Sequence, residues 1–197
     1  VSGIMITAND VTERVEARQK VEESEERSRR AIEAANMGTF DWDMVTNEFI
    51  SSARLNDIFG FPGQQNITHQ NLLDSFHPDD KAIRNKAVAD AGEKGYLNYE
   101  ARIFWKDNSV HWVKVFGKMV YNNNHQPLKM YGTVGDITDT KNTLNILQES
   151  EERFRNVANN APVLIWMAGA DQRSYFFNTA WLSFTGRTMQ QEAGNGW

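Results

Sequence analysis

The sequence predicts an α+β fold: a five-stranded antiparallel sheet with short helices on one face, flanked by long connector helices. Three observations predict it. Several segments alternate apolar and polar residues, as half-buried strands do. Short helical segments lie between the second and third of these strands. Two long, charged segments without Gly or Pro lie on either side, which is typical of extended helices.

The individual elements follow from alternation, capping residues and turn residues. The expected strands are Gly38–Asp43, Asn47–Ile50, Asn98–Trp105, Val110–Tyr121 and Leu128–Asp136. The expected helices are Ala53–Gly60, Asn71–Phe76 and Asp79–Glu93. Asp107-Asn108 and Asn122–Asn124 supply the turns between the last three strands.

Composition excludes several classes of function. The chain has 197 residues, enough for one or two small domains, and its net charge of -5 argues against nucleic acid as a partner. It contains no cysteine, which excludes disulfides, thiolate metal sites, cysteine nucleophiles and a cysteinyl-flavin photoadduct. No apolar run is long enough for a membrane span. We expect a cytoplasmic location, although a longer parent protein could be anchored elsewhere.

An internal repeat organises the chain at an offset of 126 residues. Ser24-Glu25-Glu26-Arg27 recurs as Ser150-Glu151-Glu152-Arg153, and Gly60 matches Gly186. We therefore expect one complete domain with part of a similar domain on each side. The expected division is a last strand of a preceding domain at 1–10, a connector helix at 11–30, the complete domain at 31–137, a connector helix at 138–156, and the truncated start of a following domain at 157–197.

The connector helices begin with the pattern of a capping box at Asp10–Glu13 and Asp136–Asp139. Steps of three and four residues trace an apolar seam along each helix, weaker in the first. The stronger seam is Ile137, Thr140, Leu144, Leu147, Glu151, Phe154, Ala158 and Ala161. Such a seam suits a solvated helix that packs on its own domain. It also suits a parallel dimer that carries signals between domains, which we favour.

Four sequence motifs of the middle segment resemble those of the PAS domain family, in particular its fold-3 subclass with the C-terminal PAC motif. They are Gly38–Asp43 (GTFDWD), Phe76–Asp80 (FHPDD), Tyr99–Val113 with its Lys106-Asp107-Asn108 turn, and Gly132–Thr138 (GTVGDIT). The order and spacing match the family. Phe40 replaces the usual Trp, and Asn108 replaces a Gly in a turn that Asn also tolerates.

PAS domains commonly hold a flavin, haem or small metabolite between sheet and helices, so the resemblance implies a candidate cavity. The ligand-pocket candidates are Phe40, Trp42, Phe59, Phe76, Ile103, Trp105, Trp112 and Val134, and Phe116 belongs to the same aromatic set. The cofactor is unknown; haem is not favoured, because Asp79–Glu93 carries no histidine. We favour a core filled by its own aromatic side chains, with at most a small ligand.

Two charged groups suggest structure rather than catalysis. In His77-Pro78-Asp79-Asp80, Pro78 suits a helix start and the carboxylates suit its first turn, so we predict no metal site. Glu100 and Arg102 share one face of their strand, and we predict a surface cross-strand ion pair there. We find no catalytic residue in the sequence.

The joint between the last strand and the exit helix is the candidate signal relay. Its residues are Asp136, Ile137 and Thr138, with Asp10 and Thr12 at the equivalent preceding joint. Plain helix capping explains Asp136 equally well. The resemblance implies a bacterial sensory module that passes a ligand, redox or partner signal through the helices to an output domain.

The implied partners are a second copy through the connector helices, adjacent PAS and output domains, and a small-molecule ligand. The output implied first is a histidine kinase of a two-component system. The alternatives are the input module of a diguanylate cyclase, a structural spacer and dimerisation module without ligand, or an enzyme acting within the cavity, for which no residue set is evident.

Overall fold

The computed structural model of the chain describes residues 12–64 and 67–194. The chain divides into two compact units, Val1–Thr138 and Asp139–Trp197, and each is described by itself. The predicted Asp10 and the strand at residues 1–10 lie outside the described residues. The first unit contains α1 (Thr12–Ala34), β1 (Gly38–Asp43), β2 (Phe49–Ser51), α2 (Ala53–Ile58), α3 (His69–Ser75), a short 3₁₀ helix (Pro78–Asp80), α4 (Lys81–Lys94), β3 (Tyr96–Phe104), β4 (Val110–Tyr121) and β5 (Pro127–Asp136).

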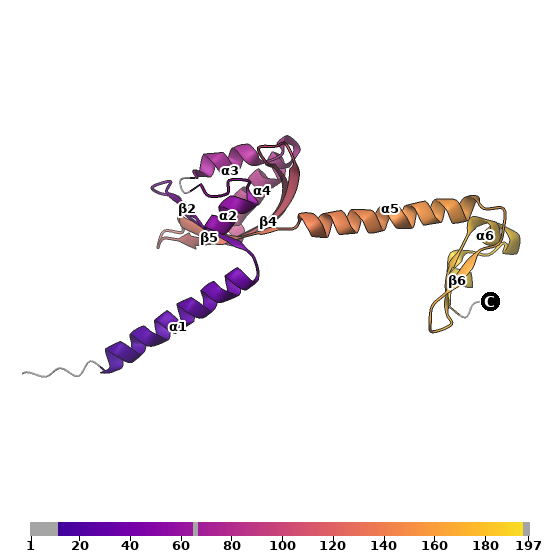
Figure 1. Ribbon diagram of the computed structural model, residues 1–197, viewed down its shortest axis with the longest axis horizontal. Helices are drawn as coiled ribbons and strands as arrows, with labels where there is room; N and C mark the ends of the chain where they lie inside the picture. Colours follow the sequence, from indigo (N-terminus) through magenta and orange to yellow (C-terminus); the bar gives the residue numbers. More distant parts are fainter. Residues whose placement is uncertain (1–11, 65–66, 195–197) are drawn as a thin grey trace, which may run out of the picture. The chain divides into compact units, whose positions relative to one another are not determined.

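The five strands form one antiparallel sheet in the order β2-β1-β5-β4-β3. The first and last strands of the domain are therefore neighbours, and β5 lies in the middle of the sheet. Helices α2, α3 and α4 cover one face, as Figure 1 shows. The predicted fold class is confirmed.

Local capping explains why the helical segment breaks into short pieces. The Ser52 hydroxyl accepts a hydrogen bond from the Leu55 amide at the start of α2, and Thr68 and Asn71 form a capping box at the start of α3. Helix α4 ends at Gly95, whose φ of 78° is left-handed. Each cap satisfies backbone groups that the short helices leave unpaired.

The core lies between this helical layer and the inner face of the sheet. Odd-numbered positions of β3 and β4 face inward, so Ile103, Val113 and Val115 are buried, and the even-numbered positions face the other side. From the helices, Leu55, Ile58, Phe59, Leu72, Phe76 and Ala91 complete the core. Each large, fully buried apolar side chain contributes about 1.5–3 kcal/mol.

Gly38 sets how closely α2 approaches the sheet. A Cβ atom at Gly38 would lie 2.5 Å from the Leu55 Cα, which is too close for any side chain. The glycine at the start of the GTFDWD motif is therefore explained by helix–strand contact rather than by turn geometry.

The boundaries of the strands and short helices differ from the expected ones by at most two residues, and β1 and β4 have the expected bounds. One local difference concerns the β4–β5 turn, where His125 takes the left-handed conformation at φ 58°. Asn108 also has a positive φ of 65°, as its place in a tight turn predicts.

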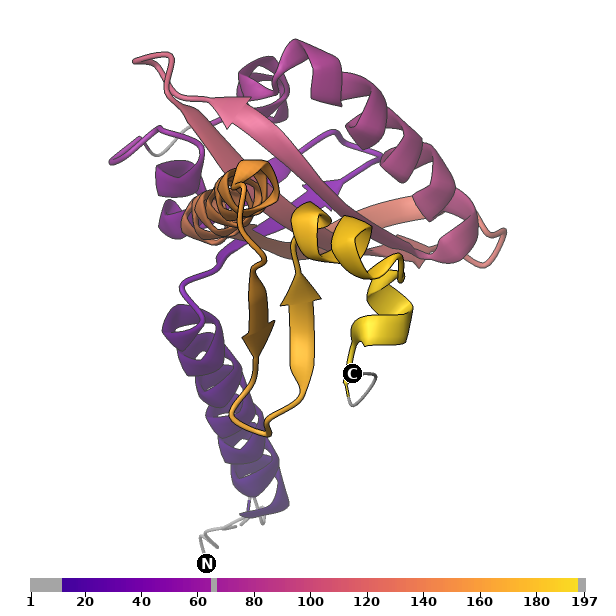
Figure 2. The ribbon, with the colours of Figure 1, turned by 90° about the vertical axis from the view of Figure 1, so that its right-hand side faces the viewer.

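The second unit contains α5 (Thr138–Asn160), which begins at the last residue of the first unit, and then β6 (Trp166–Ala168), β7 (Ser174–Phe177), α6 (Thr179–Thr185) and α7 (Met189–Glu192). Strands β6 and β7 form an antiparallel hairpin, and Figure 2 shows α6 and α7 following it. Asn178 is fully buried at its centre. Its amide oxygen accepts from the Ile165 and Trp181 amides, and its nitrogen donates to the Ala158 and Val163 carbonyls, so no buried polar atom of this side chain is left unpaired.

The elements recur at the offset of the sequence repeat. Helices α1 and α5 both have 23 residues and occupy equivalent positions. Strand β7 and helix α6 correspond to β2 and α2, and Gly60 and Gly186 both have left-handed backbones. No helix in the described part of the chain is both long enough and apolar enough to cross a membrane.

Candidate functional site

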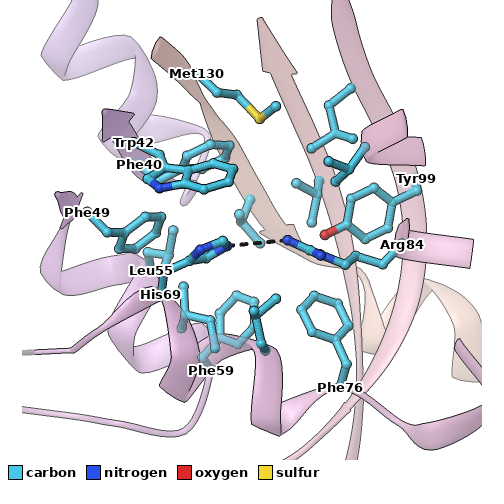
Figure 3. A pocket seen from close by; sticks show the side chains of 16 residues that line it. Phe40, Trp42, Phe49, Leu55, Phe59, His69, Phe76, Arg84, Tyr99 and Met130 are labelled. Atoms are coloured by element: carbon cyan, nitrogen blue, oxygen red, sulfur yellow. Dashed lines mark hydrogen bonds between the residues drawn. The ribbon is translucent and has the colours of Figure 1, made fainter. Parts of the chain in front are cut away.

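The first candidate site is a cavity of about 50 Å³ between the inner face of the sheet and helices α2, α3 and α4 (Figure 3). It is smaller than the about 300–1,000 Å³ of pockets that hold drug-sized ligands. Its lining is mostly aromatic and aliphatic. The lining residues are Phe40, Trp42, Phe49, Leu55, Phe59, His69, Leu72, Leu73, Phe76, Arg84, Val88, Leu97, Tyr99, Val115, Met130 and Val134.

Three polar side chains enter this apolar lining from three different elements. His69 comes from α3, Arg84 from α4 and Tyr99 from β3. The Arg84 Nη2 lies 3.3 Å from the His69 Nε2, the contact drawn as a dashed line in Figure 3. The cavity is therefore apolar with a single cluster of hydrogen-bonding groups.

His69 is held in its neutral form. Burial, and then the positive charge of Arg84, lower the pKa of its imidazole from 6.5 to about 4. The ring lies 4.3 Å from the Trp42 ring and stacks at 5.4 Å on Phe49, centroid to centroid. A neutral Nε2 can accept a hydrogen bond, so Arg84 is the donor of the pair.

Tyr99 keeps its phenolic proton. Burial raises the pKa of its hydroxyl to about 12, although the nearby Arg84 guanidinium opposes the rise. The cavity therefore presents one permanent cation and two neutral polar groups at neutral pH.

Five of the eight candidate pocket residues line this cavity: Phe40, Trp42, Phe59, Phe76 and Val134. The other three do not. Ile103 is fully buried, but it lies in the core beside the cavity.

Trp105 and Trp112 are placed away from the cavity for separate reasons. Trp105 stacks on His111, with 3.7 Å between ring centroids, and its indole nitrogen donates to the Ile58 carbonyl at 3.0 Å. Trp112 occupies an even position of β4, so it points to the outer face, as does the exposed Phe116. Aromatic character alone suggested both residues for the cavity. Strand parity explains why Trp112 lies elsewhere, whereas Trp105 lies just past the end of β3 and is held by Ile58 and His111.

His69 and Arg84 are cavity residues that the sequence analysis missed. A signal for Arg84 was available, because it shares a helix face with Ala87, Val88 and Ala91, at steps of three and four residues. An arginine in such an apolar register faces the core. No comparable sequence signal marks His69. It lines the cavity because the short helix α3 packs over the sheet at that position.

A buried ion pair ties α4 to the sheet. Asp80 is 4% exposed, and its carboxylate accepts from the Arg102 backbone amide at 2.8 Å and from the guanidinium at 3.0 and 2.6 Å. These hydrogen bonds hold the pKa of Asp80 below its usual value. Arg102 thus pairs with the helix start, whereas Glu100 forms the cross-strand pair, with Lys114 at 3.1 Å.

The second candidate site is the joint between β5 and α5. One Asp136 carboxylate oxygen accepts from the Thr138 backbone amide at 2.8 Å and from the Thr138 hydroxyl. That hydroxyl accepts in turn from the Trp112 amide at 2.9 Å, and the Ile137 amide donates to the Trp112 carbonyl at 2.9 Å. Asp136, Ile137 and Thr138 therefore attach the first turn of α5 to the neighbouring strand β4. Thr12 begins α1 at the equivalent position.

Side chains connect α2 to this joint. The Trp105 indole bonds to the end of α2 and stacks on His111, whose Nδ1 lies 4.0 Å from Asp136 Oδ2. A Cβ atom at Gly60 would lie 2.7 Å from the Trp105 ring, so only glycine fits there.

No cluster of three or more His, Asp or Glu side chains that could hold a metal occurs among the described residues.

Known proteins resemble this chain in sequence and in structure. A family model described as PAS fold matches residues 49–134. A solved structure of a sensory box histidine kinase/response regulator from Burkholderia thailandensis matches with a TM-score of 0.57 at 27% identity, covering 66% of this chain and 98% of that chain.

Two curated relatives are longer proteins. The uncharacterized protein y4lL of Sinorhizobium fredii is 34% identical over 124 residues, which is 62% of this chain and 15% of that protein. The probable diguanylate cyclase DgcE of Escherichia coli is 21% identical over 186 residues, 94% of this chain and 17% of that protein. The chain thus spans about one sixth of the length of the curated relatives it matches.

The sheet order, the helical layer over its inner face and the cavity between them define an α+β domain of the PAS fold. The central unit of this chain, from β1 to β5, is a PAS domain.

Replacing Asp80 by Asn should lower the free energy of unfolding by about 2–3 kcal/mol, because Arg102 loses its charged acceptor. Asp79→Asn is the matched control: the Asp79 side chain is 74% exposed and lies 3.7 Å from Arg102, so its loss should cost under about 0.5 kcal/mol. Urea unfolding followed by circular dichroism measures both. Equal effects of the two substitutions would show that the buried pair does not hold α4.

His69 should make stability fall in mild acid. The unfolded chain binds a proton near pH 6.5 and the folded chain only near pH 4, so the free energy of unfolding falls as the pH drops through this window. The loss is at most about 3 kcal/mol, and less in so far as solvent screens the ring. Urea unfolding is measured at several pH values from 7 to 4.5. The free energy of unfolding should fall less steeply with decreasing pH for His69→Gln than for the parent chain. The exposed-site control His125→Asn should leave the slope unchanged.

Proposed function

We propose that the PAS domain is a signal-transduction module that converts a change at its cavity into a change at the start of α5. The observation that carries this proposal is the hydrogen-bonded joint in which Asp136 and Thr138 attach the first turn of α5 to β4. A strand displacement on either side of this joint would alter the capping of the helix, and a local event of this kind can bias an equilibrium between two helix positions.

The distance along the chain between cavity and joint is short. Val134 lines the cavity, and Asp136 follows it by two residues on the same central strand. Strand β5 pairs with β1 and β4 on its two sides, so a shift at Val134 is shared with both neighbours. The stack of Trp105 on His111 supplies a second route, from α2 to Asp136.

The repeated elements support a multi-domain parent. We propose that residues 157–197 begin a following PAS domain, that residues 1–10 end a preceding one, and that 31–137 is the complete domain between connector helices at 11–30 and 138–156. The support is the recurrence of helix, strand and capped helix at one offset, with Ser52 and Asn178 as equivalent N-caps.

The output of the parent is proposed from the relatives. A solved relative is described as a sensory box histidine kinase/response regulator, and a curated relative as a probable diguanylate cyclase. We favour a histidine kinase, with a diguanylate cyclase as the alternative. In either case the module itself perceives or relays the signal, and the chemistry belongs to another domain.

The connector helices would join two copies of the chain. On α5, Leu144 and Leu147 are 56% and 64% exposed and lie one helical turn apart on the seam. Further along, Ala158 is 3% exposed and Phe154 contacts Phe176 at 5.1 Å, so that end of the seam is used within its own unit. A second copy presenting the same two leucines in register is the partner that suits an a/d spacing.

The dimer proposal predicts that Leu144→Lys together with Leu147→Lys yields monomers. Lysines at facing seam positions repel each other, and the apolar contact between the leucines is lost. Ile146→Lys is the matched control: Ile146 is 68% exposed on the same helix but off the seam. Sedimentation velocity should show a dimer for the parent chain and the control, and a monomer for the double variant. A parent chain that sediments as a monomer, or a control as disruptive as the double variant, contradicts the seam.

The relay is tested by coupling a cavity substitution to the joint. Val134→Ala loosens β5 at the cavity, and amide hydrogen exchange then reports on the first turn of α5. With the joint intact, this turn should exchange faster, by about five-fold if a capping contribution of about 1 kcal/mol is lost. In a Thr138→Val background, which has already lost the hydroxyl, Val134→Ala should add little.

Thr143→Val is the control background, since Thr143 is exposed on α5 beyond the joint and is not a residue of the seam. There the response to Val134→Ala should be retained. A structural spacer gives a different outcome, in which Val134→Ala leaves the exchange of α5 unchanged in every background.

A further inference from the structure

Arg84 is a half-buried cation with neutral neighbours. Its Nη1 donates to the Asn85 side chain at 3.1 Å, its Nη2 donates to His69 at 3.3 Å, and the Tyr99 hydroxyl lies close to it. Within the described residues no Asp or Glu carboxylate forms an ion pair with Arg84, in contrast to Arg102, which has Asp80. A guanidinium in an apolar cavity without a counter-charge is unfavourable, and an anion bound there would remove the deficit.

The geometry of the cluster favours a carboxylate over other anions. Arginine pairs with carboxylates through two parallel N–H donors, and its five donors exceed the contacts that Arg84 makes to Asn85, His69 and Tyr99. Neutral His69 and protonated Tyr99 bring no negative charge that would repel the anion. Phosphate carries more charge and requires more donors than one arginine in an apolar lining provides.

The remaining lining sets the size and character of the rest of the ligand. One water-sized group needs about 10–15 Å³, so the cavity of about 50 Å³ accepts only a few non-hydrogen atoms. The walls opposite Arg84 are Phe40, Trp42, Phe49 and Met130, as Figure 3 shows, and they offer no partner for a second polar group. A short apolar chain fits them.

We propose that the cavity binds a small aliphatic monocarboxylate of about two to four carbons, with its carboxylate on Arg84 and its chain against the aromatic wall. This inference rests on the proposed sensory function and names its ligand class. Bound ligand lies against Val134 and Met130, and therefore against the strand that leads to Asp136.

Isothermal titration of the 197-residue chain with propionate and with propionamide tests the charge requirement without any substitution. The two probes have nearly the same shape, and only propionate carries a charge. We expect propionate to bind and propionamide to bind at least ten-fold more weakly. Benzoate, which is larger, should also bind more weakly than propionate.

The role of Arg84 is tested with Arg84→Met, which keeps an unbranched side chain as far as the position of Nε and removes the charged guanidinium. Propionate affinity should fall at least ten-fold. Lys86→Met removes a charge from an exposed position of the same helix and should leave the affinity unchanged. Thermal melting establishes that both variants are folded, and the propionate–propionamide comparison stands even where Arg84→Met fails to fold.

The ligand proposal is overturned if the parent chain does not bind propionate, if it binds propionamide equally well, or if folded Arg84→Met retains full affinity. The relay can stand in each of these cases, because its exchange experiment uses Val134→Ala and no ligand. Conversely, propionate binding without any response in α5 would support the ligand site and count against the relay.

Discussion

Helices α2, α3 and α4 lie against the inner face of the sheet because Ile103, Val113 and Val115 would otherwise be in contact with water. This burial determines the position of every functional feature. It aligns the helices closely enough that Gly38 cannot carry a side chain beneath Leu55. It also encloses a small space among large rings that do not fill it completely. Val113 and Val115 lie on β4, and both the cavity and the joint include residues of the inner strands β4 and β5.

Two arginines show how the same side chain serves different purposes within this layer. Arg102 has a buried carboxylate partner that satisfies its charge, and the pair attaches the start of α4 to β3. Arg84, one turn further along α4, has only neutral partners. The fully hydrogen-bonded pair of Arg102 stabilises the structure. The unpaired charge of Arg84 in an apolar cavity instead suits the binding of an anionic ligand.

Strand β5 connects these features because the strand order places it between β1 and β4. Its inward side chains contact the cavity, and its last residue caps the next helix. A strand with neighbours on both sides cannot slide freely, so a small change at the cavity is carried to the strand end instead of being lost in a flexible edge. The same logic makes the Asp-Ile-Thr motif both a cap and a mechanical link.

Periodicity and turn chemistry in the sequence alone determined the fold class, the order of the elements and their boundaries to within two residues, because these depend on contacts between residues near in sequence. The sequence also placed Asp136 and Thr138 together, two residues apart. Trp105 and Trp112 were expected at the cavity and do not line it, since ring size reveals neither the strand face of Trp112 nor the contacts that Trp105 makes with Ile58 and His111. The meeting of His69, Arg84 and Tyr99, and the choice of Asp80 as the partner of Arg102, were decided only by the tertiary structure. These residues are 15 to 30 positions apart, and only the packing of the helical layer on the sheet brings such distant side chains together.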